Sequence, residues 1–265
     1  MRATALRRIA RNVSSLARAA DFYVRALGFE PVGAEEDDFE LAALLGFERL
    51  RCLRLQAGGR EIELSQSDPP GAPYPRAGGN VVRFQHIALL CPDIHAAYRR
   101  ALACGAEPIS THGPVRLPAS SGGVTAVKFR DPEGHPLEFI ERDAAGYDHS
   151  AISVCAVESS LGFYAGIGLH RAGGQVNRGG EQDALDGLTG AEVDVVALCP
   201  PQPSPHVELL GYRNPPASPT RWGVGDLCAD RLVFAADSPG LTLLRDPDGH
   251  VVLLDGRPLF GQAAP

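Results

Sequence analysis

The sequence predicts an α+β fold made of four tandem βαβββ modules, the fourth of them truncated. In three segments of the chain, a short apolar run is followed by a stretch with helical spacing and then by further strand-like runs. Each segment ends on a short run in which a glutamate stands between apolar residues. The segments begin at Arg7, Gln85 and Asp148, and their glutamates are Glu63, Glu138 and Glu208. Internal repetition of this kind indicates that one supersecondary unit was duplicated.

The lengths of the three units support the same conclusion. We mark the start of each unit by the residue just before its first apolar run, and its end by the glutamate of its last run. The start residues are Arg8, His86 and His149. The separations are 55, 52 and 59 residues, so the units have nearly equal lengths.

Apolar periodicity places one helix after the first strand of each unit. The stripe of the first helix consists of Leu16, Ala19, Ala20, Tyr23 and Leu27, which recur with the 3.6-residue period. We expect Ser14 or Ser15 to be its N-cap, and Gly28 to follow its last turn. In the second unit, Asp93 is the expected cap and Gly105 the expected end. The third unit shows a shorter stripe of the same kind.

The fourth unit retains only part of this pattern. Arg231 and Leu253 stand where His86 and Glu138 stand in the second unit, but they are only 22 residues apart. About 30 residues are therefore missing, which is enough for the helix and the strand after it. We expect a domain boundary near Gly146. This gives a first domain over residues 1–146, with modules one and two, and a second over 147–265.

Composition narrows the class of protein. Hydrophobic residues make up 44% of the 265 residues, charged residues make up 22%, and the formal net charge is −7. These values are typical of a globular protein, and the acidic balance argues against nucleic acid or an anionic membrane as partner. No stretch of 18 uninterrupted apolar residues is present, and the six cysteines form no C-x-x-C pair. We expect a cytoplasmic protein that binds a small molecule.

Two Asp-Pro-x-Gly turns lead into the last strands of units two and four. They begin at Asp131 and Asp246, and each is followed by a histidine, His135 or His250. We expect the aspartates to accept hydrogen bonds from amides of the turn. The histidines are predicted to have a structural role.

These motifs together resemble the vicinal oxygen chelate superfamily. The resemblance rests on "FYVRALGFE", "QHIALL" and "FRDPEGHPLEFIE". This superfamily includes glyoxalase I, bleomycin-resistance proteins, extradiol dioxygenases and methylmalonyl-CoA epimerase. The resemblance implies that two modules close into a cupped half-barrel. It also implies that residues of the first and last strands of each module hold a divalent metal ion inside the cup.

The resemblance assigns four positions to each domain. In the first domain they are Arg8, Glu63, His86 and Glu138; in the second they are His149, Glu208, Arg231 and Leu253. Arginine has no lone pair to give to a cation. The expected ligands are therefore Glu63, His86 and Glu138, a set that suits Mn²⁺, Fe²⁺, Ni²⁺, Co²⁺ or Zn²⁺. The second domain is expected to bind no metal. In the alternative, Arg8 replaces the metal charge, and the cup is a buried ion network that binds an anion.

The implied function is that of a metal-dependent lyase or isomerase acting on a small oxygenated substrate. Glu63 or Glu138 is the candidate general base. The alternatives are a metal-free binding protein of the bleomycin-resistance type and, less favoured, a ring-cleaving dioxygenase. The candidate substrate-binding residues are Arg8, Tyr74, His112, Arg116 and Ser121. A sheet edge left open by the truncated module predicts a homodimer.

Overall fold

The α+β prediction is confirmed by the computed structural model, which describes residues 1–202 and 205–257. The first module comprises β1 (Ala3–Asn12), α1 (Leu16–Leu27), β2 (Glu30–Asp37), α2 (Phe39–Leu45), β3 (Arg49–Ala57) and β4 (Arg60–Asp68). The second comprises β5 (Phe84–Cys91), α3 (Ile94–Ala103), β6 (Glu107–Pro108), β7 (Val115–Arg116), the short 3-10 helix η1 (Ala119–Ser121), β8 (Thr125–Arg130) and β9 (Pro136–Glu141).

The third module repeats this order, and the fourth is shortened as predicted. The third comprises β10 (Gly146–Ser153), α4 (Val157–Gly166), β11 (His170–Arg178), α5 (Gly180–Asp186), β12 (Glu192–Cys199) and β13 (His206–Asn214). The fourth comprises β14 (Arg231–Ala236), β15 (Leu241–Arg245) and β16 (Val251–Asp255). Because β15 follows β14 after a short turn, the module goes directly from its first strand to its last two.

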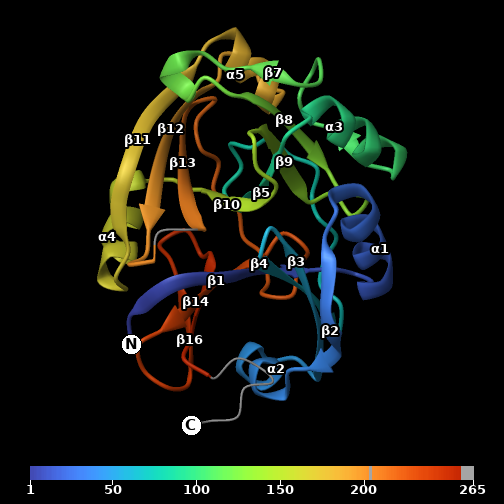
Figure 1. The fold of residues 1–265 in the computed structure, drawn as a ribbon. Helices are drawn as coiled ribbons and strands as arrows, with labels where there is room; N and C mark the ends of the chain where they lie inside the picture. Colours follow the sequence, from blue (N-terminus) through green and yellow to red (C-terminus); the bar gives the residue numbers. More distant parts are fainter. Residues whose placement is uncertain (203–204, 258–265) are drawn as a thin grey trace.

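The modules pair in a way that the sequence analysis did not predict. One sheet has the order β15-β16-β14-β1-β4-β3-β2 and the other has β11-β12-β13-β10-β5-β9-β8-β6 (Figure 1). Module one therefore shares a sheet with module four, and module two shares a sheet with module three. The expectation that modules one and two form one cup, within residues 1–146, is wrong. The short link between β9 and β10 places module three beside module two, and β1 then pairs with β14 of the last module.

Local signals in the sequence explain where the helices begin and end. Ser15, rather than Ser14, caps α1, and its side chain accepts a hydrogen bond from the Arg18 amide. Gly28 ends that helix with a φ of 77°, a conformation that favours glycine. Asp93 caps α3 by accepting from the Ala96 amide at 2.8 Å. The caps expected for the first two helices are thus confirmed.

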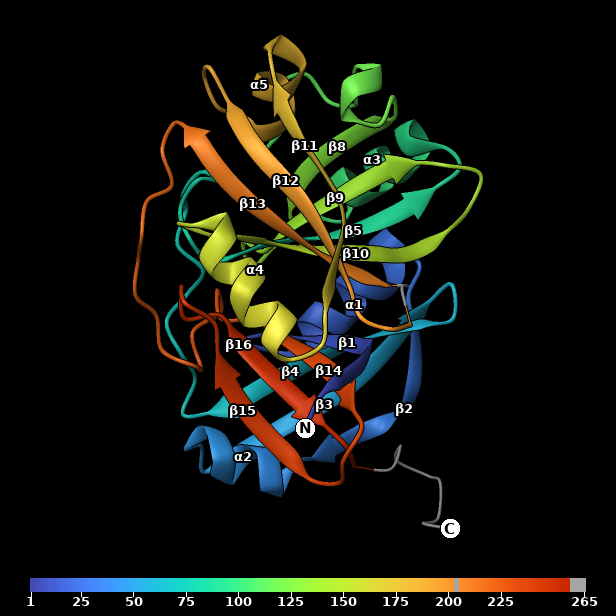
Figure 2. The same cartoon turned by 90° about the vertical axis from the view of Figure 1, so that its left-hand side faces the viewer.

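Helices α1, α3 and α4 lie on opposite sides of the molecule (Figure 1), whereas α2 packs against Ala10, Val233 and Leu253 of one sheet and α5 contacts β8 and β11 of the other. Helices α1 and α3 lie side by side on one side, and α4 lies on the other (Figures 1 and 2). One hydrophobic core extends through both sheets; it includes Ile9, Tyr23, Ile87, Tyr98, Ile152, Tyr164 and Phe234. Within the described ranges, the helices are all too short or too polar to cross a membrane. The homodimer remains a prediction.

Candidate metal centre

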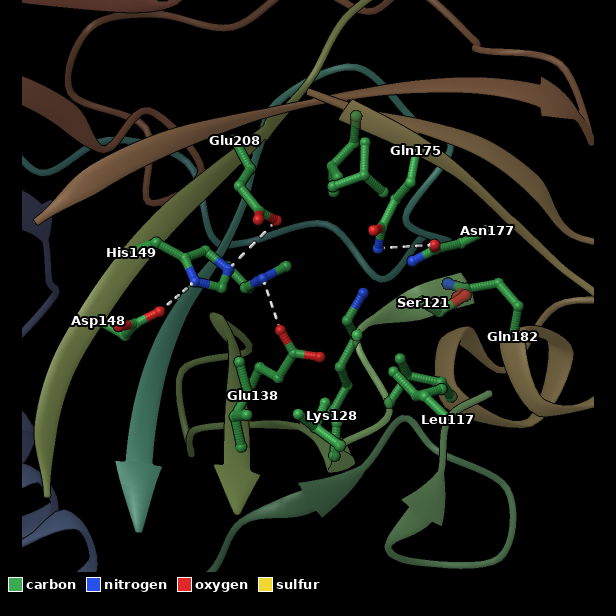
Figure 3. A pocket seen from close by; sticks show the side chains of 18 of the residues that line it. Leu117, Ser121, Lys128, Glu138, Asp148, His149, Gln175, Asn177, Gln182 and Glu208 are labelled. Atoms are coloured by element: carbon green, nitrogen blue, oxygen red, sulfur yellow. Dashed lines mark hydrogen bonds and ion pairs between the residues drawn. The ribbon is translucent and has the colours of Figure 1, made fainter. Parts of the chain in front are cut away.

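Four side chains that can bind a metal converge in the cup of modules two and three. His86 comes from β5, Glu138 from β9, His149 from β10 and Glu208 from β13. These are the first and last strands of the two modules. The four residues line a cavity of about 480 Å³, and Figure 3 shows His149, Glu138 and Glu208 directed into it.

The distances group these side chains into two overlapping sets. The ligand atoms of His86, Glu138 and His149 all lie within 4.8 Å of one another. The same limit holds for His149, His206 and Glu208. His86 Nε2 lies 2.9 Å from a Glu138 oxygen, and His149 Nε2 lies 3.4 Å from a Glu208 oxygen. His149 therefore belongs to both sets and connects the two modules.

Both central histidines donate a hydrogen bond from Nδ1, which leaves Nε2 as the atom that would bind a metal. The Nδ1 atom of His86 pairs with the side-chain oxygen of Gln85, and Nδ1 of His149 lies 2.9 Å from an Asp148 oxygen. Because these partners are acceptors, each Nδ1 carries a proton and donates it. Each Nε2 is buried, and among the described residues it has no partner in hydrogen-bonding geometry. A buried imidazole nitrogen oriented in this way fits a divalent metal ion such as Zn²⁺, Ni²⁺ or Co²⁺.

The charges in this cup also favour a cation. Burial raises the pKa of Glu138, but His86 and Lys128 outweigh it and hold that pKa below its ordinary value. Burial likewise opposes ionisation of Glu208, yet His149 and His206 lower its pKa to about 2. Both carboxylates are therefore ionised at neutral pH.

The two histidines differ in charge. Burial lowers the pKa of His86, so its ring is neutral. Burial acts on His149 in the same direction, but Glu208 and Asp148 raise its pKa to about 9. An imidazolium at His149 thus opposes part of the negative charge in the cup.

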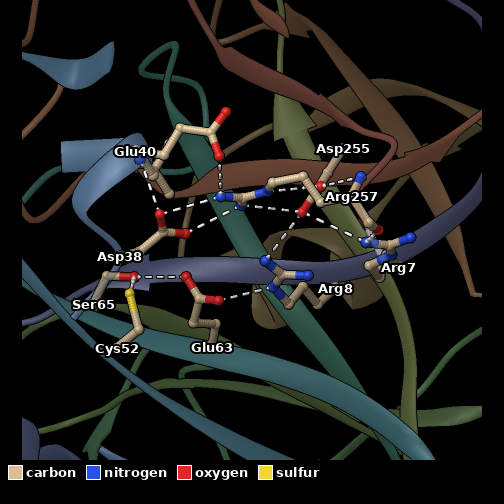
Figure 4. A network of polar contacts seen from close by, with 10 residues as sticks. Arg7, Arg8, Asp38, Glu40, Cys52, Glu63, Ser65, Asp255 and Arg257 are labelled. Atoms are coloured by element: carbon tan, nitrogen blue, oxygen red, sulfur yellow. Dashed lines mark hydrogen bonds and ion pairs between the residues drawn. The ribbon is translucent and has the colours of Figure 1, made fainter. Parts of the chain in front are cut away.

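The other cup, formed by modules one and four, holds an ion network (Figure 4). Arg8 Nε donates to Glu63 at 2.9 Å, and Arg8 Nη2 lies 3.6 Å from Asp255. Ser65 donates to the second oxygen of Glu63 at 3.0 Å. Arg8, Glu63 and Asp255 are all buried, and Arg8 occupies one of the positions that the resemblance assigned to the metal site. Arg231 is also fully buried in this cup.

The predicted ligand set of Glu63, His86 and Glu138 is therefore not assembled. His86 and Glu138 share a cup, but Glu63 belongs to the other sheet and accepts a hydrogen bond from Arg8 there. The alternative hypothesis of a buried ion network matches the contacts of Arg8. His149 and Glu208 were expected to bind no metal. Instead, they lie with His86 and Glu138 in the cup of modules two and three.

A family model matches the chain and identifies the superfamily to which it belongs. The model described as the Glyoxalase/Bleomycin resistance protein/Dioxygenase superfamily matches residues 5–139, half of the chain. The chain belongs to this superfamily. The resemblance inferred from the motifs is thereby confirmed. The matched residues are modules one and two, which lie in different sheets.

Solved structures of the superfamily share the whole two-sheet fold. Glyoxalase I from Zea mays superimposes with a TM-score of 0.64 at 15% identity, covering 95% of this chain and 92% of that one. A protein from Bacillus subtilis described as a candidate dioxygenase gives 0.62 at 15% identity, with coverages of 96% and 85%. At this identity the likeness concerns the fold alone. No curated protein matches the chain.

The predicted substrate-binding residues are scattered over the superfamily fold. Ser121 lines the cavity beside the four candidate ligands. His112 and Arg116 belong to the same connection between β6 and β8, but both are exposed and lie outside the cavity lining. Tyr74 is buried away from this cavity; its hydroxyl donates to the Phe84 carbonyl at 2.9 Å, and its ring packs against His135. Tyr74 therefore has a structural role, and Arg8 belongs to the ion network.

Sequence reasoning missed several polar residues of the cavity. Lys128, Gln175, Asn177 and Gln182 all line it. Lys128 carried a signal, because it is the only lysine in the sequence and lies within a strand-like run. Gln182 carried none, because it lies on α5, a short helix between β11 and β12 that, like α2 in module one, is not part of the predicted βαβββ pattern.

Proposed function

We propose that the cup of modules two and three binds one divalent metal ion and that the protein is a lyase or isomerase acting on a small oxygenated substrate. The ligands would be His86, Glu138 and His149, whose ligand atoms lie within 4.8 Å of one another, and Glu208 would stand beside them. The observation that carries the proposal is the pair of buried Nε2 atoms, both without a hydrogen-bond partner among the described residues and both beside a carboxylate. A bound metal would supply Lewis-acid stabilisation of negative charge on a substrate oxygen.

The two carboxylates differ in the cation that each one faces. Lys128 lies opposite Glu138 in the β8–β9 pairing and contributes to its low pKa. The cation facing Glu208 is His149, which must lose its proton before its Nε2 can act as a ligand. Once His149 has given up its proton, Glu208 has lost that cationic neighbour, whereas Lys128 remains beside Glu138. We assign Glu208 the role of general base and Glu138 that of ligand.

The first experiment measures metal content. The untagged protein, purified without chelators, should contain about one equivalent of divalent metal by elemental analysis. Glu138→Gln and His149→Gln should each lose most of it. The matched control is His95→Gln, which changes an exposed histidine on α3 and should retain the metal. Protein that holds no metal, even after titration with Zn²⁺, Ni²⁺, Co²⁺ or Mn²⁺, would contradict the proposal.

The second experiment tests the proton transfer. Small 2-hydroxy ketones and thiol adducts of 2-oxoaldehydes carry two adjacent oxygens next to an acidic C–H bond. Incubated in deuterated water with metal-loaded protein, a substrate should exchange that hydrogen for deuterium, as followed by NMR. Glu208→Gln should abolish the exchange, while Glu63→Gln, in the other cup, should not. Exchange at the wild-type rate in Glu208→Gln would remove Glu208 as the base.

A metal-free binding protein is the alternative, and one observation favours it. His149 and Glu208 form an ion pair 3.4 Å apart. Their charges therefore balance each other without a metal ion. In that case the elemental analysis would find no stoichiometric ion. Small-molecule binding would then persist in the presence of a chelator.

A further inference from the structure

A second group of polar residues lines the cavity beside the candidate ligands. Lys128 reaches into it from β8, and Gln182 enters from α5 (Figure 3). Both side chains are buried, with exposed fractions of only 4%. Burying an ammonium group and an amide costs free energy unless their hydrogen bonds are made. The contacts of these two groups therefore indicate what the cavity is built to receive.

One carboxylate behind the cavity wall holds both groups in place. Asp186 accepts from Lys128 Nζ at 2.7 Å and from Gln182 Nε2 at 2.7 Å. It also accepts from the Tyr212 hydroxyl at 2.9 Å. Asp186 lies outside the lining of this cavity, whereas its three donors all belong to it. The carboxylate thus positions the side chains that a ligand would contact.

The bonds to Asp186 leave a specific pair of groups for a ligand. Because Gln182 donates its NH₂ group to Asp186, the orientation of its amide is fixed and its oxygen points elsewhere. That oxygen is buried, and in the described part of the chain it has no hydrogen-bond partner. Lys128 has three N–H donors, of which Asp186 accepts one. The cavity therefore offers an unused acceptor and unused donors that share one anchoring carboxylate.

We infer that Lys128 and Gln182 recognise a hydroxyl group of the substrate; this inference rests on the proposed function. A hydroxyl group accepts a hydrogen bond from Lys128 and donates one to the Gln182 oxygen. A carboxylate can only accept, so it would leave the Gln182 oxygen unpaired, and an apolar group would leave both residues unpaired. The substrate class is a small hydroxylated molecule with two adjacent oxygens at the metal ligands.

The remaining walls of the cavity suit a carbon skeleton between these two polar ends. The apolar lining includes Leu117, Val124, Leu185, Val195 and Leu210. These residues come from both modules, so the skeleton would be enclosed from two sides. Burial of apolar surface would contribute to affinity without selecting a functional group.

The test compares three probes that differ in one substituent. Benzohydroxamate has two adjacent oxygens that chelate metals, and its para-hydroxy and para-carboxy derivatives add one group at the far end. Dissociation constants are measured by calorimetry on zinc-loaded protein. In wild-type protein the hydroxy derivative should bind at least about tenfold more tightly than benzohydroxamate. This ratio should fall to near one in Lys128→Met and in Gln182→Leu. It should persist in Gln175→Ala, a control that changes another amide of the same cavity.

A second readout uses wild-type protein only, in case a cavity variant does not fold. Because Lys128 is the only lysine, incorporation of lysine labelled with the NMR-active nitrogen isotope gives a single side-chain ammonium resonance. The hydroxy derivative should shift this resonance strongly, and benzohydroxamate should shift it little. In metal-free protein, phenol should shift it more than anisole does.

The outcomes separate this inference from the proposed function. If zinc or benzohydroxamate does not bind, the metal centre itself is wrong and the inference is overturned with it. If benzohydroxamate binds but the hydroxyl group brings no gain, only the inference is overturned. It is also overturned if the gain survives in both Lys128→Met and Gln182→Leu. A larger gain for the carboxy derivative would make Lys128 an anion site instead.

Discussion

Glu63 is predicted to stabilise the fold, although it stands at a ligand position of its module. Replacing it with leucine removes the carboxylate that Arg8 contacts at 2.9 Å, and it leaves Arg8 with Asp255 at 3.6 Å. Breaking a buried ion pair on one side costs about 3–5 kcal/mol. Because Asp255 remains, we expect the lower end, about 3 kcal/mol. With an unfolding entropy of about 2.1 cal/mol/K per residue, this lowers the Tm by about 5 °C.

The assay is thermal unfolding followed by circular dichroism at pH 7. Glu61→Gln, on the same strand and only partly buried, is the matched control and should change the Tm by less than about 1 °C. The double variant Arg8→Met/Glu63→Leu should be more stable than Glu63→Leu alone, because it no longer buries a guanidinium whose remaining carboxylate partner, Asp255, lies 3.6 Å away. A loss for Glu63→Leu no larger than that of the control would refute the reasoning.

The same pair predicts a pH dependence. Burial alone would raise the pKa of Glu63, but Arg8 and Arg231 hold it below its ordinary value. A carboxyl whose pKa is lowered by folding stabilises the folded state above its unfolded pKa, and it loses this effect as pH falls through the folded value. The Tm difference between wild type and Glu63→Leu should therefore be full at pH 7 and shrink below about pH 4. A difference that stays constant down to pH 3 would show that Glu63 acts through packing alone.

Three further predictions concern the metal site and the turns. Because the pKa of His149 is about 9, metal binding must release one proton, so zinc affinity should rise about tenfold per pH unit between pH 6 and 8 in chelator competition; a flat profile would argue against His149 as a ligand. Asp93→Ala should destabilise the protein by about 1 kcal/mol in thermal unfolding, with Asp93→Ser close to wild type, since the change removes the cap of α3. Asp131→Ala should destabilise the protein more, by about 3 kcal/mol, because Asp131 is buried and accepts hydrogen bonds from the amides of Glu133 and His135. The pKa of His135, measured by NMR, should also fall in this variant. An unchanged pKa would show that Asp131 does not set the charge of His135.

The sequence was sufficient to predict the repeated strands, the helix after the first strand and the turns of the modules. Two turn aspartates were expected to accept hydrogen bonds from turn amides, and Asp131 and Asp246 both do so. His135 was expected to be structural, and its Nε2 lies 2.9 Å from the Asn12 carbonyl oxygen. These features depend on a few neighbouring residues and on one helical or strand period, so they can be recognised locally.

The sequence was not sufficient to predict which modules face each other. Each module has the same strands and the same edges, so the pattern favours no particular partner. The choice depends on the links between modules and on how the first and last strands of the chain meet. Helix α5 raises a different difficulty, because it stands where α2 stands in module one, and neither short helix belongs to the βαβββ pattern that the sequence shows. Gln182 and Asp186 therefore could not be placed beside Lys128 before the structure was known.

The pairing of modules explains the role of the two arginines, Arg8 and Arg231, that stand at ligand positions. If consecutive modules shared a cup, Arg8 would replace one metal ligand in the first domain and Arg231 would replace one in the second. Each site would then lack a ligand. In the structure both arginines lie in one cup, with β1 and β14 side by side. There the positive charges of Arg8 and Arg231 balance Glu63 and Asp255, as a divalent ion would balance two carboxylates elsewhere. The two arginines thus belong to the ion network of one cup, while the other cup brings together two histidines and two glutamates.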